Sequence, residues 1–305
     1  MLSLFCVLSG DSYFGLLIKG VKMKKGFTLI ELLVVIAIIA LLLAIIMPAL
    51  GSVKEVALRL ICRNNVRQQV IGTTLYSEEN NSYVPNIVSS GTWFWDISFW
   101  STKQIAHYGG FENEIGVFAC PGNKEKKEGD ARWWQFSWVM TGSSPAGPIA
   151  NIQTKIGVMD ESVLSDSQMK SYYRVGAYLY MFDRYDDRGD SSLPEVLDSG
   201  EKAKWIRKLV DVKSPGSTTM IADSVISEGY NNTNGGSNFF EMKTLQGLWE
   251  LNVLDASNHK GRQSDADGDG KVPAGSNIGY ADGHADWRGF DEMEMRYNKG
   301  HYFYW

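Results

Sequence analysis

One charged side chain near the N-terminus strongly limits what this chain can fold into. Glu31 is the fifth residue of an apolar stretch that begins at Phe27, and the next nineteen residues, Leu32 to Leu50, carry no charge. As a helix, residues 27–50 would be about 36 Å long, enough to cross a hydrocarbon core of roughly 30 Å. A carboxylate inside such a segment is costly unless it has a partner or a function. The sequence therefore predicts a transmembrane helix over residues 27–50 with a functional acid near its start.

The residues in front of the apolar stretch distinguish it from an ordinary export signal. A secretory signal has a shorter apolar region with small residues on its far side, whereas Gly26 precedes the apolar stretch and follows Lys24 and Lys25. An uncleaved signal or a plain single-pass anchor is the alternative that hydropathy alone favours. The run Lys-Lys-Gly-Phe-Thr-Leu-Ile-Glu-Leu-Leu-Val-Val-Ile over residues 24–36 closely resembles the N-terminal signature of type IV pilins and type II secretion pseudopilins.

This resemblance implies a processing and assembly site. In that family a prepilin peptidase cuts after the glycine and methylates the new N-terminal amine. The resemblance implies cleavage between Gly26 and Phe27, methylation of Phe27, and pairing of Glu31 with the N-terminus of a neighbouring subunit. Pro48 matches the proline that bends the helix in that family, and a proline removes one helical hydrogen bond. We therefore expect a kink or a short melted stretch near residues 44–48.

The physics of Glu31 agrees with the resemblance. A carboxyl group in lipid either becomes neutral or finds a cation, and the α-amino group of an adjacent subunit's Phe27 is a suitable cation. Repeated head-to-tail contacts of this kind generate helical filaments when the rotation does not close. The expected partners are prepilin peptidase, other pilin or pseudopilin subunits, the assembly platform and membrane lipid.

Residues 1–26 are predicted to be a leader peptide, and translation could truly start at Met23. Four lysines precede the predicted span and four basic residues follow it, so charge counting does not decide its orientation. The processing motif places the N-terminus in the cytoplasm. We therefore expect a single-pass inner-membrane protein whose C-terminal body is periplasmic, or at the cell surface after assembly.

Composition describes the remainder of the chain. Without residues 1–26 there are 26 basic and 34 acidic residues, a net charge of −8, which argues against nucleic acid as a partner. Residues 51–80 predict an amphipathic helix that continues from the membrane and packs its apolar face on a sheet, although a surface helix of a separate domain is the alternative. The apolar positions at helical spacing are Val53, Val56, Ala57, Leu60, Ile61, Val66, Val70, Ile71 and Leu75.

Residues 81–305 predict an extracytoplasmic β-rich domain. Short apolar or aromatic segments alternate with turn residues, which gives strand candidates at 133–140, 172–182, 218–225 and 277–287. A short helix is expected to begin near Thr92 and to end at Gly109-Gly110. Together these elements predict an α+β, pilin-like fold in which a long N-terminal helix packs on an antiparallel sheet with long loops.

Two cysteines remain outside the leader, Cys62 and Cys120. An even pair in an oxidising compartment is consistent with one disulfide. Two separately buried thiols remain the alternative, because spacing along the chain does not show whether the two Cα atoms come within bridging distance.

A short acidic loop predicts a calcium site. Carboxylates alternate at Asp265, Asp267 and Asp269 and are followed by a glycine and Lys271, as in the first half of an EF-hand loop. The twelfth position is Ser276 in place of a bidentate glutamate, so a missing ligand would have to come from Asp255, Asp282 or Asp286. Some pseudopilins carry a structural Ca²⁺ near the C-terminus, while a solvated acidic loop is the alternative.

The C-terminal region carries a second resemblance. Residues 280–287 hold an Asp-Gly pair flanked by strand-like residues, a hairpin signal. Together with Asn258-His259, Cys62-Arg63-Asn64-Asn65 and Phe118-Ala119-Cys120-Pro121, this pattern resembles a subgroup of pilin-like proteins with a histidine, nine residues and then Asp-Gly. Here twenty-two residues separate His259 from Asp282. We interpret the acidic loop as an insertion between them.

Catalytic motifs are absent from the sequence. The four histidines lie in no metal-protease motif, and no nucleophile elbow is present. His259, His284 and Asp286 could converge on a metal, although satisfied hairpin side chains are favoured. Six tryptophans could form a sugar platform, but core packing is the favoured interpretation; they are Trp93, Trp95, Trp100, Trp133, Trp134 and Trp138.

The predicted function is a non-enzymatic structural subunit of a type IV pilus-like or type II secretion filament. The alternative is a membrane-tethered binding module, for polysaccharide for example, that uses the pilin signal for export. A cell-surface hydrolase is a weaker alternative, because the sequence reveals no polar cleft.

Overall fold

The computed structural model describes residues 27–87, 96–112, 115–123, 139–141, 144–146, 165–171, 173–183, 200, 205–228, 242–243, 254–255, 257–264, 271–298 and 301–305. The predicted leader with Gly26 and the acidic loop with Asp265, Asp267 and Asp269 lie outside the described residues. The chain divides into two compact units, Met1–Gly51 and Ser52–Trp305.

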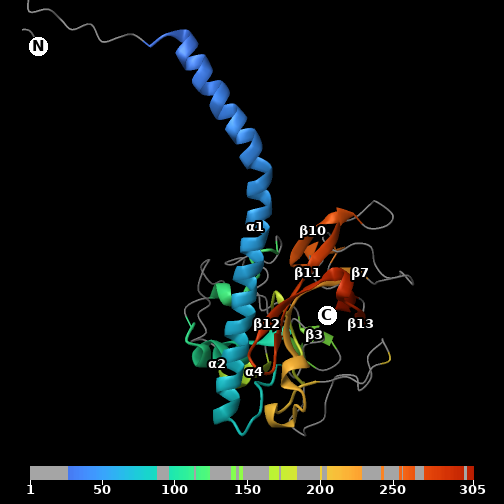
Figure 1. Ribbon diagram of the computed structural model, residues 1–305. Coiled ribbons are helices and arrows are strands. Elements are labelled where there is room, and N and C mark those ends of the chain that lie inside the picture. Colours follow the sequence, from blue (N-terminus) through green and yellow to red (C-terminus); the bar gives the residue numbers. More distant parts are fainter. Residues whose placement is uncertain are drawn as a thin grey trace, which may run out of the picture. The chain divides into compact units, whose positions relative to one another are not determined.

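A single helix, α1 (Leu29–Glu79), contains both predicted helical stretches (Figure 1). Residues 29–79 are helical throughout, including Pro48 and Gly51, so no melted stretch separates the two parts. The kink near Pro48 stays a prediction. At the other end, Asn81 and Ser82 adopt positive φ angles of 52° and 65°, which turns the chain away from the helix axis.

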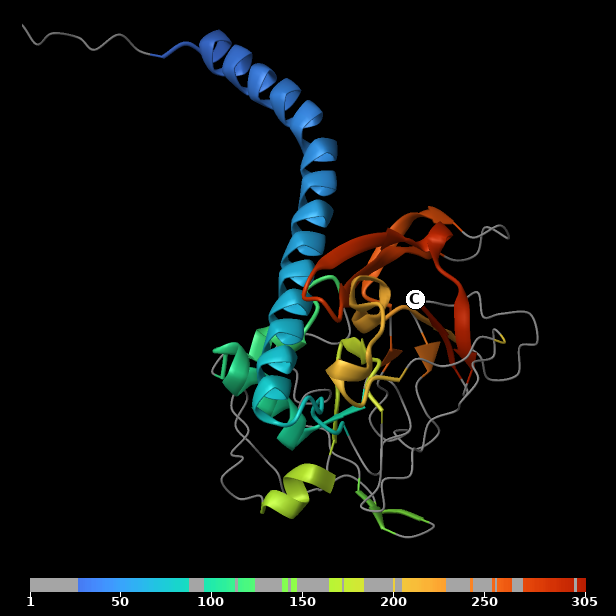
Figure 2. The same ribbon diagram turned by 60° about the horizontal axis from the view of Figure 1, so that its bottom comes forward.

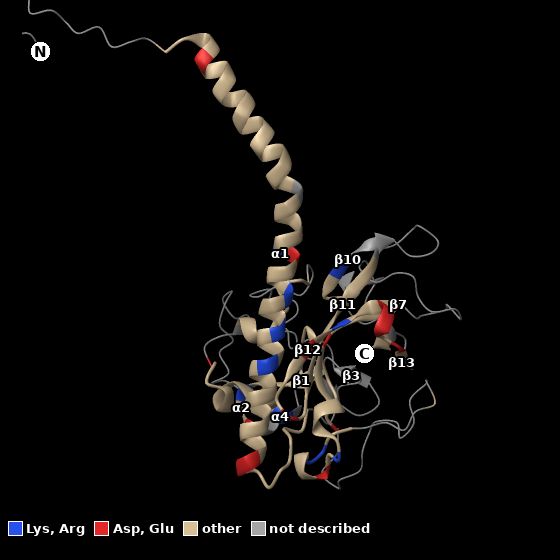
Figure 3. Cartoon of the chain, in the orientation of Figure 1, with Lys and Arg blue, Asp and Glu red and all other residues tan. Residues whose placement is uncertain are grey.

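The first part of α1 has the composition of a membrane anchor. Among the described residues, α1 is the one helix long and apolar enough to cross a membrane. Its apolar side chains are exposed over residues 29–47 and at Ala49 and Leu50, and Figure 3 shows an acidic position near the start of the helix followed by a long uncharged length. These features fit a membrane-anchored protein.

The unit Ser52–Trp305 is built around a five-stranded antiparallel sheet (Figures 1 and 2). The path β10–β11–β6–β5 gives the strand order, and β12 pairs with the second half of β11. Ile278 of β11 lies opposite Ala222 on one side and Asp286 on the other, which fixes the register at the centre. The strands are β5 (Tyr178–Tyr180), β6 (Thr219–Asp223), β10 (His259–Ser264), β11 (Lys271–Tyr280) and β12 (Ala285–Gly289).

Smaller elements surround this sheet. A three-stranded antiparallel sheet has the order β13–β14–β7, and three two-stranded ladders pair β1 with β4, β2 with β3, and β8 with β9. The bounds of these strands are β1 (Asp96–Ser98), β2 (Val139–Thr141), β3 (Ser144–Ala146), β4 (Tyr173–Val175), β7 (Ile226–Glu228), β8 (Met242–Lys243), β9 (Leu254–Asp255), β13 (Met295–Asn298) and β14 (His301–Tyr304). The short helices are α2 (Phe99–Gly109), η1 (Ile115–Phe118), α4 (Asp166–Ser171), η3 (Leu209–Asp211), η4 (Pro215–Ser217) and η5 (Phe290–Glu292).

The structure confirms the α+β class and several predicted elements. Strands β5, β6 and β11 lie in or across the predicted segments, and the Asp-Gly pair forms the turn of the β11–β12 hairpin. Helix α2 ends as predicted, because Gly110 adopts φ +74° and its N–H bonds back to the carbonyls of Ala106 and His107. The helix begins later than predicted, with Ser98 capping its first turn.

The prediction that the apolar stripe of residues 51–80 packs on the sheet is wrong for most of that stripe. Of its members, Val66 and Val70 are buried, whereas the others are exposed: Val53, Val56, Ala57, Leu60, Ile61, Ile71 and Leu75. The buried face of α1 instead contains Cys62, Asn65 and Gln69 next to those two valines.

Polar residues can occupy this buried face because the neighbouring backbone satisfies them. The Asn65 side-chain amide donates to the carbonyls of Gly116 and Ala119, both at 3.2 Å. The Gln69 amide donates to Val117 O at 2.8 Å, and its oxygen accepts from the Tyr180 hydroxyl at 2.8 Å. Burial of a side-chain amide costs little free energy when the amide has hydrogen-bond partners. Hydropathy alone therefore predicted the wrong face of α1 as the buried one.

Gly279 of β11 lies directly against α1. A Cβ atom at Gly279 would lie 2.6 Å from Val66 Cγ1 and 2.7 Å from Val70 Cγ2. Because these are short, branched side chains in a packed core, they have little room to move. The absence of a side chain on β11 therefore lets the helix pack directly on the strand.

We predict that Gly279→Ala lowers the free energy of unfolding by about 1–3 kcal/mol, since one added methyl forces α1 away from β11. Chemical denaturation of the full-length protein in detergent micelles measures this loss. Gly51→Ala is the control, because a Cβ atom at Gly51 meets nothing within 4 Å. Equal stabilities of the Gly279→Ala variant and the wild type would contradict the packing described above.

Candidate functional site

The start of α1 holds the carboxylate that the sequence singled out. Oε2 of Glu31 accepts hydrogen bonds from the backbone N–H and the hydroxyl of Thr28, both at 2.8 Å. In return, the Thr28 hydroxyl accepts the N–H of Glu31 at 3.2 Å. This reciprocal arrangement is a capping box, in which the first helical N–H groups find partners. It orients the Glu31 carboxylate toward the N-terminal end of the helix, next to Thr28, the residue that follows Phe27.

Thr28 is a residue that the sequence interpretation missed. Its signal is the spacing Thr-x-x-Glu immediately before an apolar run, which marks a capping box. Phe27 precedes the helix and is exposed. The residues named by the processing prediction that the structure describes, Phe27 and Glu31, are therefore neighbours at the start of the helix, and Gly26 lies outside the described residues.

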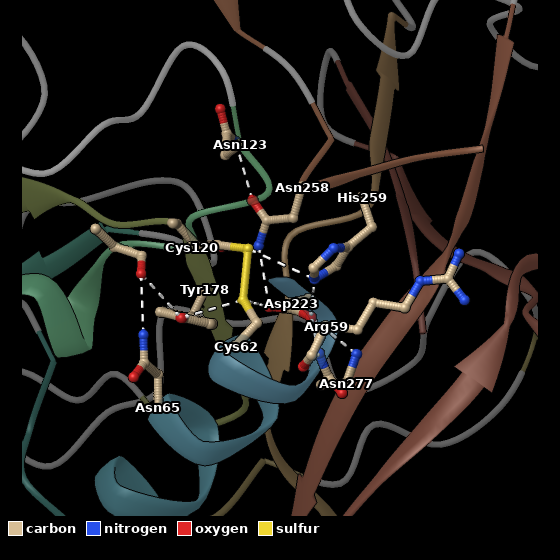
Figure 4. Close-up of a disulfide and its surroundings, with 12 residues drawn as sticks. Arg59, Cys62, Asn65, Cys120, Asn123, Tyr178, Asp223, Asn258, His259 and Asn277 are labelled. Atoms are coloured by element: carbon tan, nitrogen blue, oxygen red, sulfur yellow. Dashed lines mark hydrogen bonds and ion pairs between the residues drawn. A yellow bond between two sulfur atoms is a disulfide. The ribbon is translucent and has the colours of Figure 1, made fainter. Parts of the chain in front are cut away.

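A second cluster lies buried inside the unit Ser52–Trp305 (Figure 4). Cys62 of α1 and Cys120, which follows η1, form a disulfide with their Cα atoms 5.5 Å apart. Both side chains are buried. The bridge ties α1 to the segment after η1, across 58 residues of sequence.

Asp223, the last residue of β6, lies beside the disulfide and is fully buried. Oδ2 accepts from the backbone N–H and the side-chain amide of Asn277, at 2.9 and 2.8 Å. Oδ1 accepts from the Asn258 amide at 3.1 Å and lies 3.0 Å from the sulfur of Cys62. A buried carboxylate is tolerated when several donors surround it, and this one has three, from strand β11 and from the loop before β10.

His259, the first residue of β10, completes the cluster. Its Nε2 lies 3.1 Å from Asp223 Oδ2 and 3.5 Å from the sulfur of Cys120. Its Nδ1 is buried and has no hydrogen-bond partner among the described residues. Gly122 gives the ring its space, since a Cβ atom there would lie 2.6 Å from Nδ1.

Tyr178 and Asn258 close the other sides of the cluster. The Tyr178 hydroxyl donates to Ala119 O at 3.2 Å and lies 3.4 Å from the sulfur of Cys62. Burial, and then the charge of Asp223, raise the pKa of Tyr178 well above its ordinary value, so the hydroxyl stays neutral. The Asn258 amide also donates to Ala177 O at 2.6 Å. The cluster thereby connects α1, β6, β10 and β11.

The structure brings together some predicted residues and separates others. Cys62, Cys120 and His259 were all singled out from the sequence and meet in this cluster, but Asp223 and Asn277 were not, because no spacing along the chain links them to the cysteines. His259, His284 and Asp286 do not converge on a metal site, and the favoured interpretation of His284 and Asp286 as satisfied hairpin side chains is confirmed. His284 pairs with Asp282 and Asp286 pairs with Arg63, at the surface, whereas His259 is buried.

The calcium site stays a prediction. Asp265, Asp267 and Asp269 lie outside the described residues, and Lys271 begins β11. Two of the suggested additional ligands already have partners, since Asp282 accepts from His284 and Asp286 pairs with an arginine. Of the six tryptophans, Trp100 alone lies among the described residues, where its ring meets Tyr76 edge to face at 5.8 Å.

Asp282 provides a test of the hairpin geometry. The His284 ring and then the His284 backbone N–H donate to Oδ1, at 2.5 and 3.1 Å, and lower the pKa of Asp282. A lowered folded-state pKa contributes stability that is present above the unfolded-state pKa of about 3.9 and is lost as the pH falls through the folded-state pKa. We predict that His284→Ala raises the pKa of Asp282, measured by NMR titration. Lys103→Ala, on α2, is the control, and an unchanged value in His284→Ala would contradict the geometry.

Comparison with known proteins assigns a class to the N-terminal segment. Residues 21–47 match the prokaryotic N-terminal methylation motif, and this range contains Gly26, Phe27 and Glu31. The chain is also similar to the type IV wide pilus major component PilA4 of Thermus thermophilus, with 44% identity over 62 residues. The match covers 20% of this chain and 47% of that relative, so the chain spans about half the length of the relative it matches. No solved structure matches the chain.

Proposed function

We propose that this protein is a pilin-like structural subunit. Prepilin peptidase cuts it between Gly26 and Phe27 and methylates Phe27, and the mature subunit then assembles into a filament. Its role is structural and not catalytic. The methylation motif and the similarity to a pilus component both concern the N-terminal part of the chain. The proposal extends the pilin-like role from that part to the whole protein.

The observation that carries the proposal is the position of Glu31 within an exposed apolar helix. Oε2 is held by Thr28 at the helix start, and the apolar side chains that follow are exposed. A carboxylate at this depth needs a cation in lipid. The methylated amine of Phe27 on a neighbouring subunit supplies that cation, and repetition of the contact builds a filament.

The exposed stripe on the next part of α1 supports the same role. It consists of Val53, Val56, Ala57, Leu60 and Ile61, which recur at helical spacing and do not pack in the core of their own unit. Exposed apolar patches of this kind mark interaction sites. In the filament these residues pack on α1 of adjacent subunits.

Finer assignments belong to this proposal as well. The filament is a type IV pilus-like or a type II secretion pseudopilus, and the subunit enters it from the inner membrane with its N-terminus in the cytoplasm. The Asn258-His259 pair and the Asp282-Gly283 turn support membership of the pilin-like subgroup described above. The acidic loop at residues 265–271 would then hold Ca²⁺ as an insertion.

The decisive experiment replaces Glu31. We expect Glu31→Ala and Glu31→Gln to leave processing intact but to abolish filament incorporation, because removing one partner of a buried charge pair costs about 3–5 kcal/mol per contact. Glu31→Gln removes the charge but keeps the shape of the side chain, whereas Glu31→Ala removes both. Glu78→Ala, an exposed acid near the other end of α1, is the control. Immunogold imaging and sedimentation of sheared filaments measure incorporation.

Two outcomes would contradict the proposal. A Glu31→Ala protein that enters filaments normally would mean that the carboxylate does not direct assembly. A protein that never enters filaments, yet is retained in the membrane and binds polysaccharide regardless of Glu31, would identify a tethered binding module. Mass spectrometry of the mature N-terminus tests processing, since any start other than methylated Phe27 excludes cleavage at Gly26.

A further inference from the structure

The buried cluster contains the donor atoms of a metal site in addition to a disulfide. The two cysteine sulfurs, a carboxylate oxygen of Asp223 and a ring nitrogen of His259 all lie within 4.8 Å of one another. All four side chains are buried. Two sulfurs, one imidazole nitrogen and one carboxylate oxygen form a four-donor set of the kind that Zn²⁺ binds in proteins.

The separations between these donors are close to those around a tetrahedral ion. With Zn–S near 2.3 Å and Zn–N or Zn–O near 2.0–2.2 Å, ligand atoms lie about 3.3–3.8 Å apart. Cys120 Sγ lies 3.5 Å from His259 Nε2, which lies 3.1 Å from Asp223 Oδ2. Cys62 Sγ lies 3.0 Å from Asp223 Oδ1. The two sulfurs are bonded to each other and must separate to bind a metal, which requires the disulfide to be broken.

Groups behind the donors hold them in place. Asn277 donates twice to Oδ2 of Asp223, and Asn258 donates to Oδ1. The Trp287 ring meets the His259 ring edge to face at 5.3 Å. Supporting groups of this kind orient metal ligands and raise affinity, and they are already present around the disulfide.

We propose that the dithiol form of this protein binds one Zn²⁺ ion through Cys62, Cys120, Asp223 and His259. A phosphine reductant breaks the S–S bond, takes the oxygen of one water molecule to become a phosphine oxide, and leaves two thiols. Zn²⁺ then displaces one proton from each thiol, and the ring proton of His259 moves from Nε2 to Nδ1. The ion binds both thiolates, the Nε2 that has lost its proton, and one carboxylate oxygen. The disulfide and the metal are therefore alternative cross-links at one position in the fold, and the oxidation state of the cysteines selects between them.

The test uses the full-length protein in detergent micelles. Because the site is buried, the protein is unfolded in denaturant and refolded with a phosphine reductant and Zn²⁺ or Co²⁺, and in parallel under oxidising conditions with the same ions. We expect one metal ion per chain in the reduced sample only. With Co²⁺ the reduced sample should show a thiolate-to-cobalt charge-transfer band and the intense visible bands of a tetrahedral site.

Variants assign the ligands. Loss of a group that only supports a metal ligand weakens metal binding about 10- to 100-fold. Because His259→Ala and Asp223→Asn change the ligands themselves, each should weaken Zn²⁺ binding by at least that much. His284→Ala, on the surface hairpin, and Asp267→Ala, in the predicted calcium loop, should leave binding unchanged. Circular dichroism checks that each variant refolds, and the wild-type comparison of reduced with oxidised protein stands even where a variant does not.

Three results would overturn the proposal. The first is reduced wild-type protein that binds no metal. The second is equal binding by reduced and oxidised protein, which would exclude the cysteine sulfurs. The third is a refolded His259→Ala variant with the affinity and cobalt spectrum of the wild type.

Discussion

Asp223→Ala should lower the free energy of unfolding by about 3–5 kcal/mol, because several buried donors would lose the carboxylate that accepts their hydrogen bonds. The carboxylate accepts from two donors of Asn277 and one of Asn258, and it faces the ring of His259. Without it the Asn277 backbone N–H and one N–H of each side-chain amide lose their acceptor inside the core, at about 1–3 kcal/mol each. Denaturant titration of the full-length protein in detergent micelles, followed by tryptophan fluorescence, measures the loss.

Matched variants separate the effect of charge from that of shape. Asp223→Asn fills the same space and keeps one accepting oxygen, so its loss should be smaller than that of Asp223→Ala. Asp211→Ala replaces an exposed carboxylate in η3 and should change stability by no more than about 0.5 kcal/mol. An Asp223→Ala protein as stable as the Asp211→Ala protein would show that the carboxylate does not hold the cluster together.

Removal of the disulfide is the second large effect. Cys62 and Cys120 are 58 residues apart, and closing a loop of that length restricts the unfolded chain by about 4 kcal/mol in the chain-entropy model. The double variant Cys62→Ala/Cys120→Ala should therefore lose stability on that order in a metal-free, non-reducing buffer. Thermal and chemical denaturation both report the loss.

Reduction of the wild-type protein provides the control for this variant. In metal-free reductant the wild type should approach the stability of the double variant, because neither then carries a cross-link. In unreduced, denatured wild-type protein, a thiol reagent should label neither Cys62 nor Cys120. Labelling of both cysteines would contradict the bridge and the predicted loss.

Local patterns predicted the parts of the fold that depend on neighbours in sequence. The apolar run after Glu31 predicted the helix, Gly109-Gly110 predicted the end of α2, and Asp282-Gly283 predicted the hairpin turn. Each of these signals acts within a few residues, through helix geometry or a positive φ angle. Thr28 belongs to the same class, since a capping box is readable from four consecutive residues.

Burial was harder to predict than secondary structure. The apolar stripe that includes Val56 and Leu60 was expected to face the sheet, but the buried face of α1 contains Asn65 and Gln69. Their amides bond to the backbone after α2 and to Tyr180. Such partners come from distant segments, so the sequence does not show which polar groups will be satisfied when buried.

The sequence by itself determined the methylation motif and the long apolar start of α1, because motif, apolar length and helix capping all lie within one continuous run from Lys24 to Leu50. The tertiary structure alone decided the buried cluster. Cys62, Cys120, Asp223 and His259 come from four separate segments and meet because α1 packs on β11 at Gly279 and the registers of β6, β10 and β11 bring their residues together. Contacts of that range follow from packing and strand register, which no local pattern along the chain encodes.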